Sequence, residues 1–153
     1  MSARIPTLAG SQRPGNIAVL LREAFVALND LVLVKLAESG HGDVRPAHSA
    51  VLQYLDDTGT RVSDLADRAQ MTKQAMAELV SHLEAHDYVA RVPDPSDRRA
   101  KLVLPTPRGQ EVFAIAQGLV PQIEERVNDV IGARRLAALK TDLEAIRRAL
   151  ADG

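Results

Sequence analysis

The stretch from Thr60 to Gly109 constrains the fold most, because a helical pattern gives way to an extended one within it. It begins with a short helix that Thr60 can cap. A tight turn follows at Gln70, where a left-handed backbone would cost roughly 1 kcal/mol. A second helix, which Thr72 can cap, leads into two short extended runs joined by a basic segment. This order predicts a helix-turn-helix followed by a β-hairpin wing, two elements that can reach neighbouring grooves of DNA.

The second helix of the pair has one apolar side, and the residues at its start have short or polar side chains. Its apolar residues fall at helical spacing and are expected to face inward. Lysine and glutamine near its start carry the donors that suit guanine and adenine. By itself the pattern also fits an ordinary helical hairpin with a solvated face. The residues expected to read the major groove are Thr72, Lys73, Gln74, Ala77 and Glu78.

The wing is expected to consist of strands over 88–93 and 101–104. The Asp-Pro-Ser-Asp sequence between them has turn chemistry, and Arg98 and Arg99 are expected at the tip. Arginine at such a tip can enter a narrow minor groove, drawn by its negative potential, and Asp97 can hold an arginine by an ion pair. The alternative is that both arginines are simply solvated. The predicted wing contacts are Asp97, Arg98, Arg99 and Lys101.

Long apolar stripes of helical spacing flank this region on both sides. The first covers residues 16–38 and the second covers 110–151, where Pro121 is expected to kink or interrupt the helix and Gly132 to end its first part. In the last part, apolar residues step at a spacing of coiled-coil type. The residues expected to lie between two subunits are Leu136, Leu139, Leu143 and Ile146.

The length of 153 residues suits one domain with a sizeable core. The predicted fold class is mainly α with a small β-wing, in which long N- and C-terminal dimerisation helices flank a winged helix-turn-helix domain. That domain is expected over 47–109, with its wing over 89–105 and a short helix over 47–56 at its beginning. Residues 1–14 are interpreted as an arm that is ordered only when docked.

The charges of the chain are nearly balanced overall but unevenly distributed. The formal net charge is −1, so DNA binding has to use a local patch. Residues 91–108 hold five cationic side chains and two carboxylates, a local charge of +3. The chain has no cysteine, which excludes disulfides and thiol redox sensing. No apolar run reaches the roughly 18 to 20 residues of a membrane span, and a soluble cytoplasmic protein is expected.

Three short runs around the wing resemble the MarR family of winged-helix transcription regulators. They read Leu83-Glu84-x-x-x-Tyr88-Val89, Asp94-Pro95-x-Asp97-Arg98-Arg99-Ala100-Lys101 and Leu104-x-Thr106-Pro107-x-Gly109. The resemblance covers the central third of the chain closely and the flanking helices more loosely. Pro105 departs from the commoner pattern, in which the leucine and threonine are adjacent.

The resemblance implies a homodimeric repressor that binds a palindromic operator in double-stranded DNA. Thr72, Lys73 and Gln74 would read the major groove, and Arg99 would insert into the minor groove. It also implies a small organic effector, often aromatic or phenolic, and a pocket is expected where the long helices meet the winged domain. The rival is a ligand-binding or protein-interaction dimer of this fold that does not bind DNA, against which the basic wing argues.

Other groups of polar residues give weaker signals. Glu78, His82 and His86 share one face of a helix and have a spacing that can chelate zinc. No metal is expected there, because the helix is the one assigned to DNA. The histidines near Asp43 are equally ambiguous. No Ser-His-Asp order, P-loop or Rossmann glycine pattern occurs, so we expect no catalytic residues, no resident cofactor and no enzymatic activity.

Overall fold

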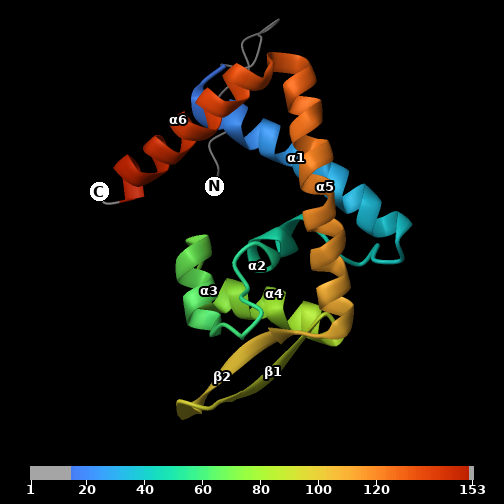
Figure 1. Cartoon of the computed structure of the whole chain (residues 1–153). Helices are drawn as coiled ribbons and strands as arrows, with labels where there is room; N and C mark the ends of the chain where they lie inside the picture. The colour runs from blue at the N-terminus through green and yellow to red at the C-terminus, as the bar shows by residue number, and fades with distance from the viewer. Residues whose placement is uncertain (1–14, 152–153) are drawn as a thin grey trace, which may run out of the picture.

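The computed structural model describes residues 15–151, which form a mainly helical fold with one β-hairpin (Figure 1). This confirms the predicted fold class. The expectation about residues 1–14 lies outside the described residues. The elements in chain order are α1 (Ile17–Glu38), the 3-10 helix η1 (Pro46–His48), α2 (Ser49–Leu52), α3 (Val62–Ala69), α4 (Lys73–Ala85), β1 (Val89–Asp94), β2 (Asp97–Pro105), α5 (Pro107–Ile131) and α6 (Ala133–Ala151).

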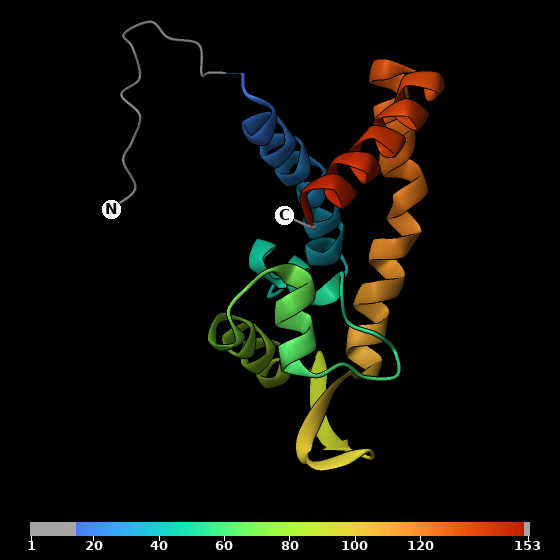
Figure 2. The same cartoon turned by 90° about the vertical axis from the view of Figure 1, so that its left-hand side faces the viewer.

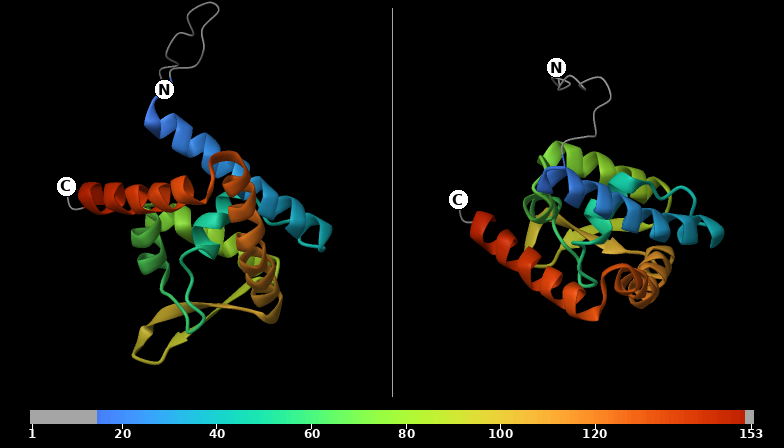
Figure 3. Two further views of the ribbon diagram at one scale, coloured as in Figure 1. Left: turned by 45° about the horizontal axis from the view of Figure 1, so that its top comes forward. Right: turned by 90° about the horizontal axis from the view of Figure 1, so that it is seen from above.

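α1 and α6 lie toward one end of the described chain and the wing lies at the other (Figures 1 and 2). α5 connects the two ends, since it begins next to the wing, packs against α1 and ends at the turn into α6. Seen from above, α6 turns back from α5 and lies apart from α1 over most of its length (Figure 3). Among the described helices, none is long and apolar enough to cross a membrane.

The core of the winged domain forms where the short helices meet the wing. The apolar faces of α3 and α4 pack together and against α2, as their helical spacing predicts. Each fully buried side chain stabilises the fold by roughly 1.5–3 kcal/mol. Because the apolar face of α4 is fixed in this core, its polar face is held toward solvent. The fully buried residues include Val51, Leu65, Met76, Val80, Leu83 and Val103.

The turn between α3 and α4 has the backbone that the sequence predicts. Gln70 has φ 54° and ψ 44°, a left-handed conformation. The amide of Met71 donates to the carbonyl of Ala66 at 2.8 Å, which closes the turn. Thr72 then caps α4, because its hydroxyl oxygen accepts from the Ala75 amide at 3.1 Å.

Thr60 does not cap α3, contrary to the expectation. The N-cap position belongs to Arg61, whose side chain makes no capping bond. Thr60 instead forms an antiparallel bridge with Val103 of β2, with N–H to O distances of 3.0 and 2.8 Å. Its hydroxyl accepts from the Asp56 amide at 3.0 Å. This pairing satisfies two buried backbone groups, whereas a cap would satisfy one.

The helix expected over 47–56 is shorter in the structure and is divided into η1 and α2. The amide of Leu55 still donates to the carbonyl of Val51 at 3.0 Å. The chain then leaves the helical path, which allows Thr60 to reach β2. A tertiary contact therefore ends the helix earlier than its local sequence indicates.

The two wing arginines lie in β2, beside the tip, and not at the tip as expected. β1 and β2 are antiparallel, and residues 95–96 form the turn between them. The register shifts next to this turn, so that residues 98–100 are extra residues in β2 with no partner in β1. Such a bulge twists a strand locally and re-aims its side chains, and it carries Arg98 and Arg99.

α5 runs continuously across Pro121, so of the two expected effects, a kink or an interruption, the interruption does not occur. Pro121 and Gln117, whose carbonyl loses its helical partner to the proline, are both exposed, so water can satisfy that carbonyl. Gly132, with φ 84°, ends α5 as predicted. α6 follows and contains no fully buried residue.

The beginning of α5 packs directly on the beginning of β1. Thr106 caps α5 by accepting from the Gly109 amide at 3.1 Å, and its own amide donates to the carbonyl of Tyr88 at 3.0 Å. Its hydroxyl donates to the carbonyl of Asp87 at 2.5 Å. Gly109 is buried here, and a Cβ atom at this position would overlap the Tyr88 carbonyl. The close approach of the two backbones therefore requires glycine.

We predict that Gly109→Ala lowers the free energy of unfolding by about 2 kcal/mol or more, because backbone has to move to admit the methyl group. Gly118→Ala is the matched control, since Gly118 lies in the same helix with open space around it. That change should raise stability by about 0.5–1 kcal/mol. Chemical denaturation of both variants measures the difference, and equal effects would contradict the packing described here.

Candidate nucleic-acid interface

Four of the five residues expected to read DNA are exposed at or near the start of α4. They are Thr72, Lys73, Gln74 and Glu78, whereas Ala77 is half-buried. The first turn of a helix presents unpaired backbone N–H groups and a partial positive charge. Lys73 adds a full positive charge at the same place. The start of α4 is therefore suited to approach a polyanion.

The wing presents three exposed cations close together: Arg98, Arg99 and Lys101. Within residues 15–151, none of the three forms an ion pair. The expected ion pair between Asp97 and an arginine is also not formed. The carboxylate of Asp97 instead accepts from the backbone amide of Arg99 at 3.0 Å. Asp97 thus holds the backbone of the bulge and leaves the guanidinium groups free.

Two other arginines of the basic segment are neutralised by carboxylates. Arg91 binds Glu84 of α4 at 2.7 Å and also reaches the hydroxyl of Ser81 at 3.2 Å. Arg108 lies 3.5 Å from Asp43. The local excess of positive charge that the sequence indicates therefore lies on the wing itself, while Arg91 fastens β1 to α4.

An ion pair that the sequence does not predict holds the base of the wing to the helix-turn-helix. Arg61, at the start of α3, binds one oxygen of Asp94 through two nitrogens at 2.8 and 2.7 Å. The other oxygen accepts from the amide and hydroxyl of Ser96 at 2.9 and 2.8 Å. The bonds from Ser96, and then Arg61, lower the pKa of Asp94 to about 2. The carboxylate thus fixes the wing turn and its angle to α3.

A buried polar cluster joins the winged domain to α5. Tyr88, only 1% exposed, donates its hydroxyl to Asp43. Arg108 of α5 donates to the same hydroxyl at 2.9 Å and stacks over the ring at 4.5 Å, and His41 Nδ1 lies 3.1 Å away. Burial, and then the bond to Asp43, raise the pKa of Tyr88 to about 12. The phenol therefore stays neutral and acts as a fixed hydrogen-bonding centre.

Three histidines form a stack between η1 and the end of α4. The rings of His48 and His82 are 4.6 Å apart and nearly parallel, and those of His82 and His86 are 4.2 Å apart. His48 Nδ1 accepts from the Arg45 amide at 2.8 Å. Glu78 is exposed. In residues 15–151, no three histidine, cysteine or acidic side chains are placed to hold a metal ion.

The stack predicts sensitivity to acid. Burial, and then the neighbouring His82, lower the pKa of His48 from 6.5 to about 4. The unfolded chain takes up a proton below about pH 6.5, and the folded chain resists it until about pH 4. Stability should therefore be complete above that range and fall as the pH drops through it. Urea denaturation between about pH 7 and pH 4 measures this decline. His48→Asn should flatten it, and an unchanged slope in that variant would contradict the assignment.

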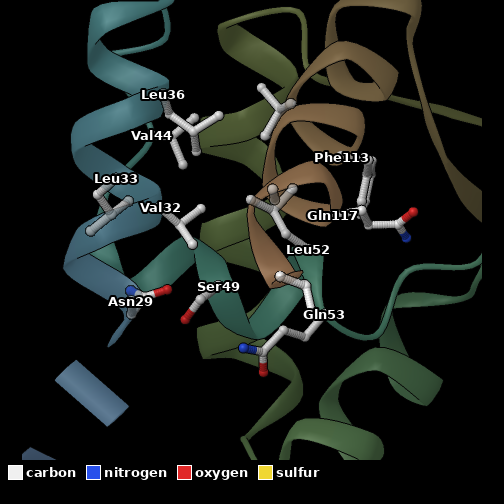
Figure 4. A pocket seen from close by; sticks show the side chains of 13 residues that line it. Asn29, Val32, Leu33, Leu36, Val44, Ser49, Leu52, Gln53, Phe113 and Gln117 are labelled. Atoms are coloured by element: carbon white, nitrogen blue, oxygen red, sulfur yellow. The ribbon is translucent and has the colours of Figure 1, made fainter. Parts of the chain in front are cut away.

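A cavity of about 280 Å³ lies where α1, α2 and α5 meet (Figure 4). A pocket is expected from the sequence at this position, between the long helices and the winged domain. Leu36, Val44 and Val112 form its buried apolar wall. Asn29, Ser49 and Gln53 gather at the opposite end (Figure 4).

Comparison with known proteins agrees with this geometry. Residues 43–100 match the model of the MarR family. The chain is 34% identical over 74 residues to the transcriptional activatory protein BadR of Rhodopseudomonas palustris, which covers 48% of the chain and 41% of BadR. It is 27% identical over 81 residues to the transcriptional regulator HosA of Escherichia coli, which covers 53% of the chain and 60% of HosA. The matches thus span less than two thirds of either relative.

The fold agrees with solved structures over nearly the whole chain. The PcaV transcriptional regulator of Streptomyces coelicolor, solved in complex with its natural ligand, superposes with a TM-score of 0.67 at 23% identity. The alignment covers 93% of this chain and 94% of PcaV. The described residues thus form a winged helix-turn-helix protein with long flanking helices. The chain is therefore similar to the MarR family in the sequence of its winged domain, over residues 43–100, and to solved transcriptional regulators in its fold.

Proposed function

We propose that the protein is a sequence-specific transcription regulator that binds double-stranded DNA through α4 and the wing. The supporting observation is a group of four exposed cations that form no ion pair within the described residues, in a chain whose net charge is −1. These cations are Lys73 on α4 and Arg98, Arg99 and Lys101 on β2. The two elements lie at the same end of the molecule (Figure 1), where one duplex can contact both.

The helix and the wing have different tasks in this proposal. Thr72, Lys73 and Gln74 contact base edges in the major groove, with Ala77 and Glu78 one turn further along the helix. Arg98, Arg99 and Lys101 contact phosphates and the neighbouring minor groove, where Arg99 inserts. Asp97 keeps the bulge in the shape that presents them. The helix therefore determines which sequence is bound, and the wing contributes affinity.

This division can be measured on an operator selected from the DNA upstream of the gene. Lys73→Ala should relax specificity at one or two base pairs by about 1–3 kcal/mol each. Arg99→Ala should weaken binding to all sequences and reduce the salt slope by about one unit per wing. Arg134→Ala is the matched control, because Arg134 is an exposed cation near the start of α6. α6 follows the end of α5 that lies away from the wing (Figure 1). Equal losses for Arg99→Ala and Arg134→Ala would argue against the wing contact.

The active form in this proposal is a homodimer on a palindromic operator. α6 has no fully buried residue in the single chain, and its apolar seam includes Leu139 and Ile146, which are 40% and 44% exposed. Leu136 and Leu143 are half-buried on the same helix. A second copy that covers this seam would place two recognition helices in successive major grooves, about 34–36 Å apart.

Ile146→Asp should abolish the dimer, because an unpaired carboxylate in an apolar interface costs several kcal/mol. Thr141→Asp is the matched control, since it adds the same charge to the same helix on the side away from the seam. Sedimentation velocity should find a monomer for the first variant and a dimer for the second. Operator binding should be lost together with the dimer. A dimeric Ile146→Asp protein would contradict the assignment of α6.

We further propose that a small organic molecule in the cavity between α1, α2 and α5 releases the protein from DNA. The support is the location of the cavity, whose lining comes from the long helices and from the winged domain. An occupant that fits one arrangement of these helices better than another changes the spacing of the recognition helices. PcaV was solved with its natural ligand, and a small ligand is consistent with that neighbour.

In this proposal the protein acts as a repressor in the cytoplasm and catalyses no reaction. BadR carries the name of an activator, so a promoter–reporter fusion is the measurement that separates the two signs. The rival function is a ligand-binding or protein-interaction dimer that does not bind DNA. That rival becomes the better explanation if the protein fails to shift any upstream DNA at low salt, where phosphate contacts are strongest.

A further inference from the structure

The cavity between α1, α2 and α5 is lined without a single charged side chain among the described residues. Apolar groups form most of its wall, including Val32, Leu33, Leu52 and Phe113. The volume of about 280 Å³ suits a small molecule with about one ring. A mostly apolar molecule therefore matches this wall.

The polar groups of the wall are neutral, and three of the four lie at one end, while Gln117 lies beside Phe113 (Figure 4). Asn29, Ser49 and Gln53 face this end from α1, α2 and the turn after α2 (Figure 4). The Ser49 hydroxyl already donates to the carbonyl of Pro46 at 2.8 Å, so toward a ligand it offers an acceptor. The two side-chain amides each offer both donors and an acceptor. This end can bind a head group that both donates and accepts hydrogen bonds.

A charged head group of either sign is disfavoured. An ionised carboxylate against the half-buried Asn29 and Ser49 would lose part of its hydration and gain no opposite charge from the wall. Asp56 and Asp57 line a second hollow that shares Gln53 and Phe113 with the cavity, and their negative charge adds repulsion against an anion. A cation would lose its hydration as well, because the cavity itself contains no carboxylate.

We propose that the effector is an uncharged molecule with an apolar body and one amide-like or hydroxyl head group, and not an organic acid. This inference rests on the proposed role of the cavity as the effector site. It assigns the ligand class from the wall itself: apolar residues along the body and neutral amides at Asn29 and Gln53 for the head.

Three isosteric probes test the charge of the head group: benzamide is neutral, benzoate is an anion and benzamidine is a cation. Isothermal titration of the full chain without DNA, at about pH 8, compares their dissociation constants, because a carboxylic acid is ionised and an amidine protonated there. Benzamide should bind at least tenfold more tightly than either charged probe. Tighter or equal binding of benzoate or benzamidine would overturn the proposal, and so would the absence of saturable binding by all three at millimolar concentration.

Two substitutions at the polar end should reverse the order. Asn29→Lys should make benzoate bind more tightly than benzamide, because the lysine supplies the missing positive charge. Asn29→Asp should make benzamidine bind more tightly than benzamide, because the aspartate supplies the missing negative charge. Circular dichroism checks that both variants fold, and the wild-type comparison stands without them. Operator binding by the wild type without ligand is measured separately. A failure of the charge order with intact operator binding would therefore overturn the ligand class and leave the DNA-binding function in place.

Discussion

The close approach of β1 to the start of α5 is the constraint on which the rest of the structure depends. Gly109 permits the two backbones to touch, and the buried hydroxyl of Tyr88 then forms hydrogen bonds with both Asp43 and Arg108. The wing, the chain after α1 and the long connecting helix are joined there. Because α4 leads into β1 within a few residues, the direction of α5 relative to α4 is fixed by the same contact.

This junction also connects the cavity to the elements that we propose to bind DNA. Val112 and Phe113 of the cavity wall follow Arg108 by about one turn of α5. In the proposed response to a ligand, a tilt of α5 would therefore act directly on Tyr88. The histidine stack also fastens the C-terminal end of α4 to η1. α4 is thus held at its C-terminal end by these two polar contacts, while Thr72, Lys73 and Gln74 at its start are exposed.

Features that depend on neighbouring residues could be predicted from the sequence. The element order, the cap at Thr72 and the left-handed Gln70 follow from local patterns, and the exposed start of α4 follows from helical periodicity. The incorrect predictions concern positions whose structure depends on a residue far away in the sequence. Thr60 pairs with β2 and thereby shortens the helix before it, and the register shift moves Arg98 and Arg99 away from the tip.

The same reason limits what could be predicted of the candidate site. The positive charge of the wing is visible in the composition of the segment, but its division into paired and unpaired arginines is not. Asp94 and Arg61 are 33 residues apart, and Tyr88 and Asp43 are 45 apart. A single sequence gives no spacing rule for such pairs. Whether these contacts form is decided by the packed fold.

The lack of buried residues in α6 has a consequence for how the molecule opens. Local unfolding is inexpensive where few apolar contacts are broken. In an isolated chain, α6 can detach without exposing a core, whereas α3 and α4 cannot separate without opening the centre of the winged domain. The backbone amides of α6 should then exchange with solvent deuterium by detachment of this helix alone, and those of α4 only in global unfolding. A single chain thus has two levels of stability, and the lower one belongs to the helix with the exposed apolar seam.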